Sequence, residues 1–166
     1  VNGGAVYITD GGTFTMNDDA YIRNCNATNS GGGVCMNSGS SFTMSGGMID
    51  SCTSGLEGGG VYVTDSSNPC TFKMLDKASI NGCSAVNGGA VYVSGGTFTM
   101  NGDGTISYCN AKYGGAVYIT GKGTFNMNGG SIADCFATDS AGGGVWMNNG
   151  SSFTMSGGMI DSCTSG

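Results

Sequence analysis

The segment GGGVCMNSGSSFTMSGGMIDSCTSG at 31–55 returns at 142–166 as GGGVWMNNGSSFTMSGGMIDSCTSG. The two segments differ only at Cys35/Trp146 and Ser38/Asn149, so 23 of their 25 positions are identical. A catalytic site is built once in a chain, whereas a structural unit is often built several times. The duplication therefore indicates a repeat architecture, and the same pattern extends through the rest of the chain.

Three short blocks recur in the same order six times. The first follows a Gly-Gly pair and reads like VYI, the second reads like TFTM, and the third contains an Ile followed three residues later by Cys. The first block begins at Val6, Val34, Val61, Val91, Val117 and Val145. Consecutive blocks are therefore 28, 27, 30, 26 and 28 positions apart.

Each block alternates apolar and polar residues, and Gly, Asn, Ser and Asp separate the blocks. Such alternation is typical of half-buried strands, and the separating residues are typical of turns. A helix is disfavoured, because nothing recurs at 3.6 residues and each Gly inside a helix would cost roughly 1 kcal/mol. The pattern predicts an all-β fold, a right-handed parallel β-helix (β-solenoid) with three strands per coil and about six coils of 26–31 residues. We expect one domain over 1–166, with repeats at approximately 3–31, 32–58, 59–87, 88–113, 114–142 and 143–166.

The repeat pattern reaches both ends of the chain without an atypical capping unit. Joining CTSG at 163–166 to VNGGAVYI at 1–8 gives a spacer of the same length as in CTSGLEGGGVYV at 52–63. A bare solenoid end is an unpaired sheet edge. We therefore expect uncapped ends, which belong either to a longer tandem array or to a subunit that stacks end to end into a filament.

The blocks also resemble the repeats of known surface proteins. GGAVY followed by F-x-x-N (FTMN at 14–17 and 98–101, FNMN at 125–128) resembles the GGA[I/L/V] and FxxN repeats of polymorphic membrane proteins and the repeats of large β-helical adhesin-like cell-surface proteins. The likeness covers the whole chain but consists of scaffold motifs, and Ser45, Leu75 and Ser156 replace the final Asn. The resemblance implies a β-helical fold and an extracellular or cell-surface location, and it names no ligand.

Six of the eight cysteines occupy one position per coil, and we call them the Cys column: Cys25, Cys52, Cys83, Cys109, Cys135 and Cys163. Stacked coils would place consecutive members about 4.8 Å apart. That spacing permits strained disulfides such as Cys25–Cys52, but it exceeds the preferred Cβ separation of about 3.8 Å and favours a ladder of buried free thiols. Collinear sulfurs cannot surround one ion tetrahedrally, so we expect no metal site.

Cys35 and Cys70 lie outside this column. Cys35 takes the central position of a first block, and Cys70 lies in the long turn of the next coil. Their joint occurrence in adjacent coils is consistent with a disulfide that pins the turn to the second coil. Sequence alone does not define connectivity, so a disulfide and two free thiols both remain open.

The central residue of each first block is predicted to face outward, because both of its neighbours are apolar. Aromatic residues at this position would form an exposed aromatic face: Tyr7, Tyr62, Tyr92, Tyr118 and Trp146. Such a face can bind glycans or another rod, or it can simply stabilise the sheet by cross-strand stacking, which the sequence slightly favours. The Thr residues that flank each Phe resemble the flat face of β-helical ice-binding proteins, but β-propensity on a solvated strand explains them better.

Composition disfavours several functional classes. The net charge is −6 and the five cations are scattered, which disfavours nucleic acid. No apolar run approaches the roughly 20 residues of a membrane helix. The chain has no His, and its acids, including Asp50 and Asp161, follow the repeat instead of converging in one cleft. We therefore expect no enzyme activity, no cofactor and no membrane insertion of this segment.

Together these observations predict a structural extracellular β-solenoid that forms a fibre, filament or stalk by tandem or head-to-tail stacking of coils. Its main partner would be itself, end to end and also laterally. The alternative is a cell-surface adhesin or glycan-binding module that uses the aromatic face.

Overall fold

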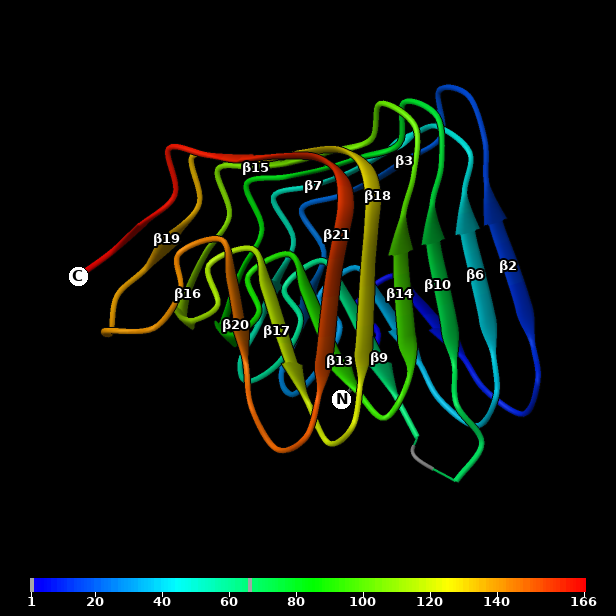
Figure 1. Ribbon diagram of the computed structural model, residues 1–166. Helices are drawn as coiled ribbons and strands as arrows, with labels where there is room; N and C mark the ends of the chain where they lie inside the picture. The colour runs from blue at the N-terminus through cyan, green and yellow to red at the C-terminus, as the bar shows by residue number, and fades with distance from the viewer. Residues whose placement is uncertain (1, 66) are drawn as a thin grey trace.

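The computed structural model describes residues 2–65 and 67–166, which form a parallel β-solenoid. This part of the chain consists of strands, turns and bends, and its coils are stacked in chain order, from blue to red in Figure 1. The predicted all-β solenoid of about six coils is confirmed, and we number the coils 1 to 6 by the repeat ranges given above. Val1, which begins the spacer discussed above, and Ser66, in the long turn of coil 3, lie outside the described residues.

The first block of every coil lies in the first sheet, where each strand pairs in parallel with the same block of the next coil. The pairing keeps one register, so that Val34 lies opposite Val6 on one side and Val61 on the other. Within β5, Val34 and Met36 enter the core and Cys35 does not. The strands are β1 (Val6–Ile8), β5 (Val34–Met36), β9 (Val61–Thr64), β13 (Val91–Ser94), β17 (Val117–Thr120) and β20 (Val145–Met147).

The second and third blocks share one bent sheet. In coils 1 to 4 they are separate strands, whereas in coils 5 and 6 one ten-residue strand runs through both. Figure 1 shows the second-block strands side by side. The strands are β2 (Thr13–Met16), β3 (Tyr21–Arg23), β6 (Ser41–Met44), β7 (Met48–Asp50), β10 (Thr71–Met74), β11 (Ser79–Asn81), β14 (Thr97–Met100), β15 (Thr105–Ser107), β18 (Thr124–Ala133) and β21 (Ser152–Asp161).

The third sheet consists of short segments that follow the Cys column, and the sequence analysis did not identify them as strands. Main-chain hydrogen bonds hold them together, such as that from the Thr53 N–H to the Cys25 carbonyl oxygen (2.9 Å). The three predicted faces per coil are therefore present, but these segments form the third face and the Ile block joins the second. The segments are β4 (Asn26–Ala27), β8 (Thr53–Ser54), β12 (Ser84–Asn87), β16 (Asn110–Tyr113), β19 (Phe136–Ala137) and β22 (Thr164–Ser165).

The core is a set of stacked columns of like residues between the sheets. Phe98 is fully buried, and its ring lies 4.9 Å from Phe72 and 4.6 Å from Phe125, with interplanar angles of 10° and 6°. Offset stacking at such distances adds about 0.5–1.5 kcal/mol to the burial of each ring. Each coil therefore depends on its two neighbours for most of its stabilisation, as expected for a solenoid.

A left-handed residue before every column cysteine sets the direction of the third sheet. Its φ lies between 51° and 59° in all six coils: Asn24, Ser51, Gly82, Tyr108, Asp134 and Ser162. Gly, Asn and Asp adopt this conformation readily, whereas other residues pay about 1–2 kcal/mol. Because the bend is the same in each coil, outward side chains at equivalent positions keep the same orientation relative to the third sheet along the whole rod.

Candidate functional site

Four residues of the predicted aromatic face lie in one continuous row of adjacent rings on the outer side of the first sheet, in which the three Tyr rings stack and Trp146 is tilted by 54° from Tyr118. Tyr62 and Tyr92 have ring centroids 5.3 Å apart, Tyr92 and Tyr118 5.1 Å, and Tyr118 and Trp146 4.6 Å. Tyr7 is not part of this row, because Cys35 lies between Tyr7 and Tyr62 in the register. We call Tyr62, Tyr92, Tyr118 and Trp146 the aromatic column.

The description of this column as exposed needs correction. Tyr92 is only 9% exposed, and the other members are half-buried, whereas Tyr7 is 49% exposed. Two features account for this: the chain folds back against the first sheet at each Gly-Gly pair, and Tyr62 and Tyr118 cover Tyr92 from both sides, whereas Tyr7 pairs only with Cys35. At Gly58, for example, an added Cβ would lie only 3.0 Å from the Tyr62 Cα. The aromatic column therefore lines an inner corner.

Burial and a nearby carboxylate shift the titration of these tyrosines. Burial raises the pKa of Tyr62, Tyr92 and Tyr118, and the Glu57 carboxylate raises each of them further. Glu57 is itself tied to the corner by a hydrogen bond from the Ser30 hydroxyl (3.1 Å). The phenols are therefore protonated at neutral pH and available as hydrogen-bond donors.

The end of the aromatic column in coils 4 to 6 carries additional polar and aromatic groups. Tyr113 stacks on Trp146 with centroids 5.4 Å apart, and Lys112 Nζ lies 5.2 Å from the Tyr113 ring centroid and 3.4 Å from Asp139 Oδ2. The Asn148 side-chain amide donates to the Tyr118 hydroxyl (3.2 Å), while its buried Oδ1 has no partner among the described residues. The aromatic rings form a platform that suits a ligand with a flat apolar face, whereas the buried Asn148 Oδ1 is not open to a ligand in this structure.

The structure places the Cys column at one bend per coil, with all six thiols free. Four members are buried, whereas Cys25 and Cys163 in the first and last coils are partly exposed. Cys83 Sγ donates to the Asn81 carbonyl (3.4 Å) and Cys109 Sγ to the Ser107 carbonyl (3.3 Å). Hydrogen bonds with neighbouring thiols, together with burial, raise the pKa of Cys52 and Cys109. Hydrogen bonds with neighbouring thiols lower the pKa of Cys83 and Cys135. The buried thiols of the column fill a corner of the core.

The disulfide between Cys35 and Cys70 is absent, and both thiols are free and buried. Cys70 belongs to the core, where its Sγ lies 3.4 Å from the Ser40 hydroxyl, whereas Cys35 projects from the opposite face of β5. A single strand therefore separates the two sulfurs. The sequence left a disulfide and two free thiols both open, because proximity in adjacent coils does not reveal on which side of a strand a turn residue enters. The structure has the two free thiols.

The Cys35 thiol predicts a loss of stability at alkaline pH. Burial raises its pKa to about 12 from 9.0, so its contribution to stability is complete below pH 9 and is lost as the pH rises through 12. For this thiol the loss amounts to at most about 4 kcal/mol. Urea unfolding from pH 8 to 12 should give a flatter profile for Cys35→Ala than for the wild-type chain. The control Met36→Leu, which changes a neighbouring core residue without a titrating group, should keep the wild-type slope; equal slopes for all three proteins would contradict the assignment.

A cleft of about 540 Å³ lies across the corner between the second and third blocks of coils 1 to 3. The turn of coil 2 is one residue shorter than the turns of coils 1 and 3, so Gly46 and Gly47 form its floor, and Asp18 and Asp76 lie on its two sides. The remaining lining residues are Asp19, Tyr21, Ser45, Met48, Lys77 and Ser79. This cleft was not predicted, although the sequence contains a signal for it in the short turn of coil 2 between the longer turns of coils 1 and 3.

The sequence analysis expected no convergence of acids in one cleft, but Asp18, Asp19 and Asp76 line the cleft described above together with Lys77. The repeat-position carboxylates Asp50 and Asp161 lie outside it. Asp50 Oδ1 accepts a hydrogen bond from the Asn81 amide (2.9 Å), and Asp161 lies opposite Ala133.

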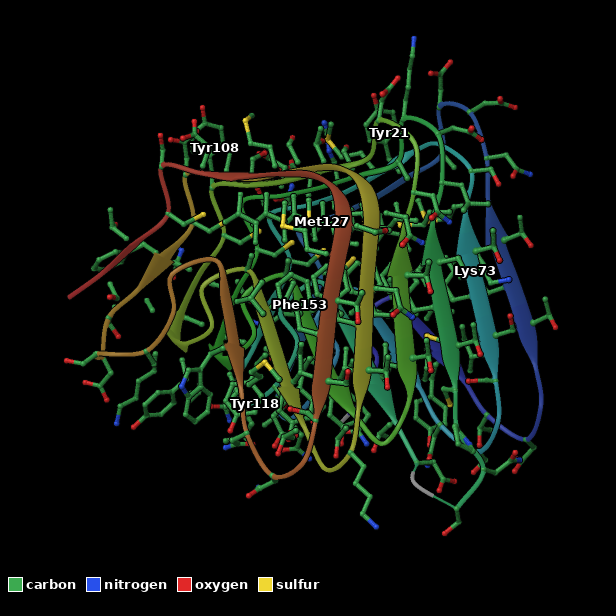
Figure 2. The ribbon with its side chains drawn as sticks, in the orientation of Figure 1. Tyr21, Lys73, Tyr108, Tyr118, Met127 and Phe153 are labelled. Carbon is green, nitrogen blue, oxygen red and sulfur yellow. The ribbon has the colours of Figure 1, made fainter. Side chains whose placement is uncertain are left out.

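Residues 2–65 and 67–166 contain no group of three or more His, Cys, Asp or Glu side chains placed to hold a metal ion. In the same residues no helix is long and apolar enough to span a membrane. Figure 2 shows Tyr118 on the opposite side of the molecule from Tyr21 and Tyr108.

Several large apolar side chains of coil 6 are exposed. Met155 is 44% exposed and Met159 is 54% exposed, and Ile160 is also exposed. The equivalent Met44 and Ile49 of coil 2 are fully buried beneath coil 3. Figure 2 shows Phe153 beside β21, on the side that faces β17 and β20.

Comparison with known proteins identifies no relative. No protein-family model matches the chain, and no curated protein and no solved structure shows significant similarity to it. The functional argument therefore rests on the geometry described above.

Proposed function

We propose that the chain is a structural segment of an extracellular or cell-surface fibre, filament or stalk, which lengthens by tandem or head-to-tail stacking of coils. The observation that carries this proposal is the constant register of the ladders. Val6, Val34, Val61, Val91, Val117 and Val145 are paired in one unbroken series through the five coil-to-coil steps. A surface that repeats the same contacts at each step can continue without a change of geometry.

The physical properties of the stack suit a load-bearing element. Main-chain hydrogen bonds run parallel to the axis at every step, and the interior contains stacked Phe, Met and Ile residues with no buried ion pair among the described residues. The resemblance of the sequence blocks to surface-protein repeats supports the proposed location.

Electron microscopy of the purified chain at neutral pH, without reductant, tests the proposal. We expect unbranched filaments of uniform width, whereas discrete short rods at all concentrations would contradict head-to-tail stacking. Ile160→Asp should abolish the filaments, because it places a charge in the apolar outer face of coil 6. The control Tyr108→Asp, which changes a 64% exposed side chain away from that face, should leave them intact.

A second candidate function, glycan binding, is favoured by the aromatic column, where Trp146 lies beside both Tyr113 and Tyr118. Trp146→Ala should weaken binding to an oligosaccharide that the wild-type chain binds in a glycan screen by about tenfold or more, because it removes the largest stacking surface of the column. Tyr21→Ala is the matched control, since Tyr21 is an exposed aromatic residue on another face. Equal binding by the wild-type chain and both variants, or no response in a broad glycan screen, would remove this candidate.

A further inference from the structure

We infer that the outer face of coil 6 binds coil 1 of a second copy of this chain, in the register that coil 3 adopts on coil 2. This inference rests on the proposed stacking function and specifies its junction. The two segments quoted at the opening carry the argument, because coil 6 is nearly a sequence copy of coil 2. What covers coil 2 within the chain therefore indicates what fits on coil 6.

Coil 3 covers coil 2 through four parallel strand pairs. Phe42 lies opposite Phe72, Met44 opposite Met74, and Ile49 opposite Ile80. These coil 2 side chains are fully buried by this contact and by coil 1 on the other side. Coil 6 carries the same residues at the same positions, namely Phe153, Met155 and Ile160, and two of them are exposed.

Coil 1 presents the same ladder residues as coil 3. Both coils pair with coil 2, and this common partner shows which of their residues are equivalent. The equivalent pairs are Val6 and Val61, Phe14 and Phe72, Met16 and Met74, and Ile22 and Ile80. Coil 1 also shares the longer turn of coil 3, with Asp18 at the position of Asp76. Coil 1 therefore carries the residue types with which coil 3 covers coil 2; within one copy Met16 and Ile22 are already buried, and Val6 and Phe14 are half-buried.

The one large difference between coils 2 and 6 supports the same junction. Cys35 interrupts the aromatic residues between Tyr7 and Tyr62, whereas coil 6 has Trp146 at this position. In the inferred register Trp146 lies opposite Tyr7 of the second copy, and the Tyr118–Trp146 pair shows that neighbouring coils accommodate a Tyr–Trp contact at 4.6 Å. The substitution extends the aromatic column across the junction to the half-exposed Tyr7.

Charge is also complementary across the junction. Asp161 takes the position of Asp50, which lies opposite Arg23 in the third-block ladder. In the inferred register Asp161 therefore lies opposite Arg23 of the second copy, and both side chains are exposed. Opposite charges at directly paired positions favour association, and like charges oppose it.

A charge-reversal and mixing experiment tests this register. Asp161→Arg or Arg23→Asp alone should raise the critical concentration for assembly about fivefold to tenfold at low salt, because each places like charges at every junction. An equimolar mixture of the two variants should recover wild-type assembly, because alternating copies restore an Arg–Asp pair at each junction. Light scattering and sedimentation velocity measure both effects, circular dichroism verifies folding, and Asp103→Arg is the control for a charge change in an exposed turn of coil 4.

The outcomes separate the junction from the proposed function. The inferred register would be contradicted if neither charge reversal changed assembly, or if the two weakened variants failed to recover on mixing. Neither result would contradict the proposed fibre. A wild-type chain that remains monomeric at all concentrations would overturn head-to-tail stacking itself.

Discussion

Replacing Phe98 with alanine should lower the free energy of unfolding by about 3–5 kcal/mol, the usual cost of removing a buried Phe side chain. Phe98 is fully buried between Phe72 and Phe125 in the central part of the stack. The truncation removes two stacked contacts and leaves a cavity that the rigid ladders on either side cannot close. Urea unfolding of dilute, unassembled protein, followed by circular dichroism, measures the change.

Phe153→Ala is the matched control for this prediction. Phe153 stacks only on Phe125 (4.9 Å) and is partly exposed in coil 6. We expect the free energy of unfolding to fall by roughly half as much as in Phe98→Ala, because one ring contact is removed instead of two. Equal losses for the two variants would show that stability does not come from stacking between neighbouring coils.

Gly89→Ala should destabilise the fold by about 3 kcal/mol or more, at or above the upper end for overpacking. An added Cβ would lie 2.6 Å from the Asn110 carbonyl oxygen and 2.8 Å from the Asn110 nitrogen, and it would overlap the Gly115 carbonyl oxygen. These are main-chain atoms of the ladder, so no side-chain rotation can relieve the contact. The coils would have to separate at the corner that the aromatic column lines.

Gly104→Ala tests whether this effect is steric. An added Cβ at Gly104 would meet its nearest atom, the Ala78 carbonyl oxygen, at 3.4 Å, and the backbone there does not require glycine. The expected change in unfolding free energy is within about 0.5 kcal/mol. Comparable destabilisation by the two substitutions would contradict close packing of main chains at Gly89.

The core and two of the three sheets were predictable because their signals repeat. The period-2 alternation around Val34, Phe42 and Ile49 identified the buried side chains, and the constant order of blocks identified parallel stacking. The third sheet was not predictable in this way. Segments such as Thr53–Ser54 are two residues long and polar, and they pair because the preceding bend aligns their main chains.

The candidate sites were harder to predict than the fold, because they depend on how the corners are built. Alternation correctly placed Tyr92 on the outer side of its strand, but it contained no information about the Gly-Gly corner that helps to bury this side chain. Cys70 illustrates the same limit, since its core position is decided by the path of a long turn. The cleft near Gly46 arises from a one-residue difference between neighbouring turns, which matters only once the coils are stacked.

X-ray diffraction from aligned filaments tests the central claim, that coils continue across the junction in the register seen within the chain. Stacked strands should give a strong meridional reflection at about 4.8 Å, and six rungs per copy should give an axial repeat of about 29 Å. Both spacings together would show that coil 1 of one copy stacks directly on coil 6 of another copy, as the next coil of the solenoid. A 4.8 Å reflection with an axial repeat clearly longer than about 29 Å would show a gap or a different contact at the junction, and the account would be contradicted.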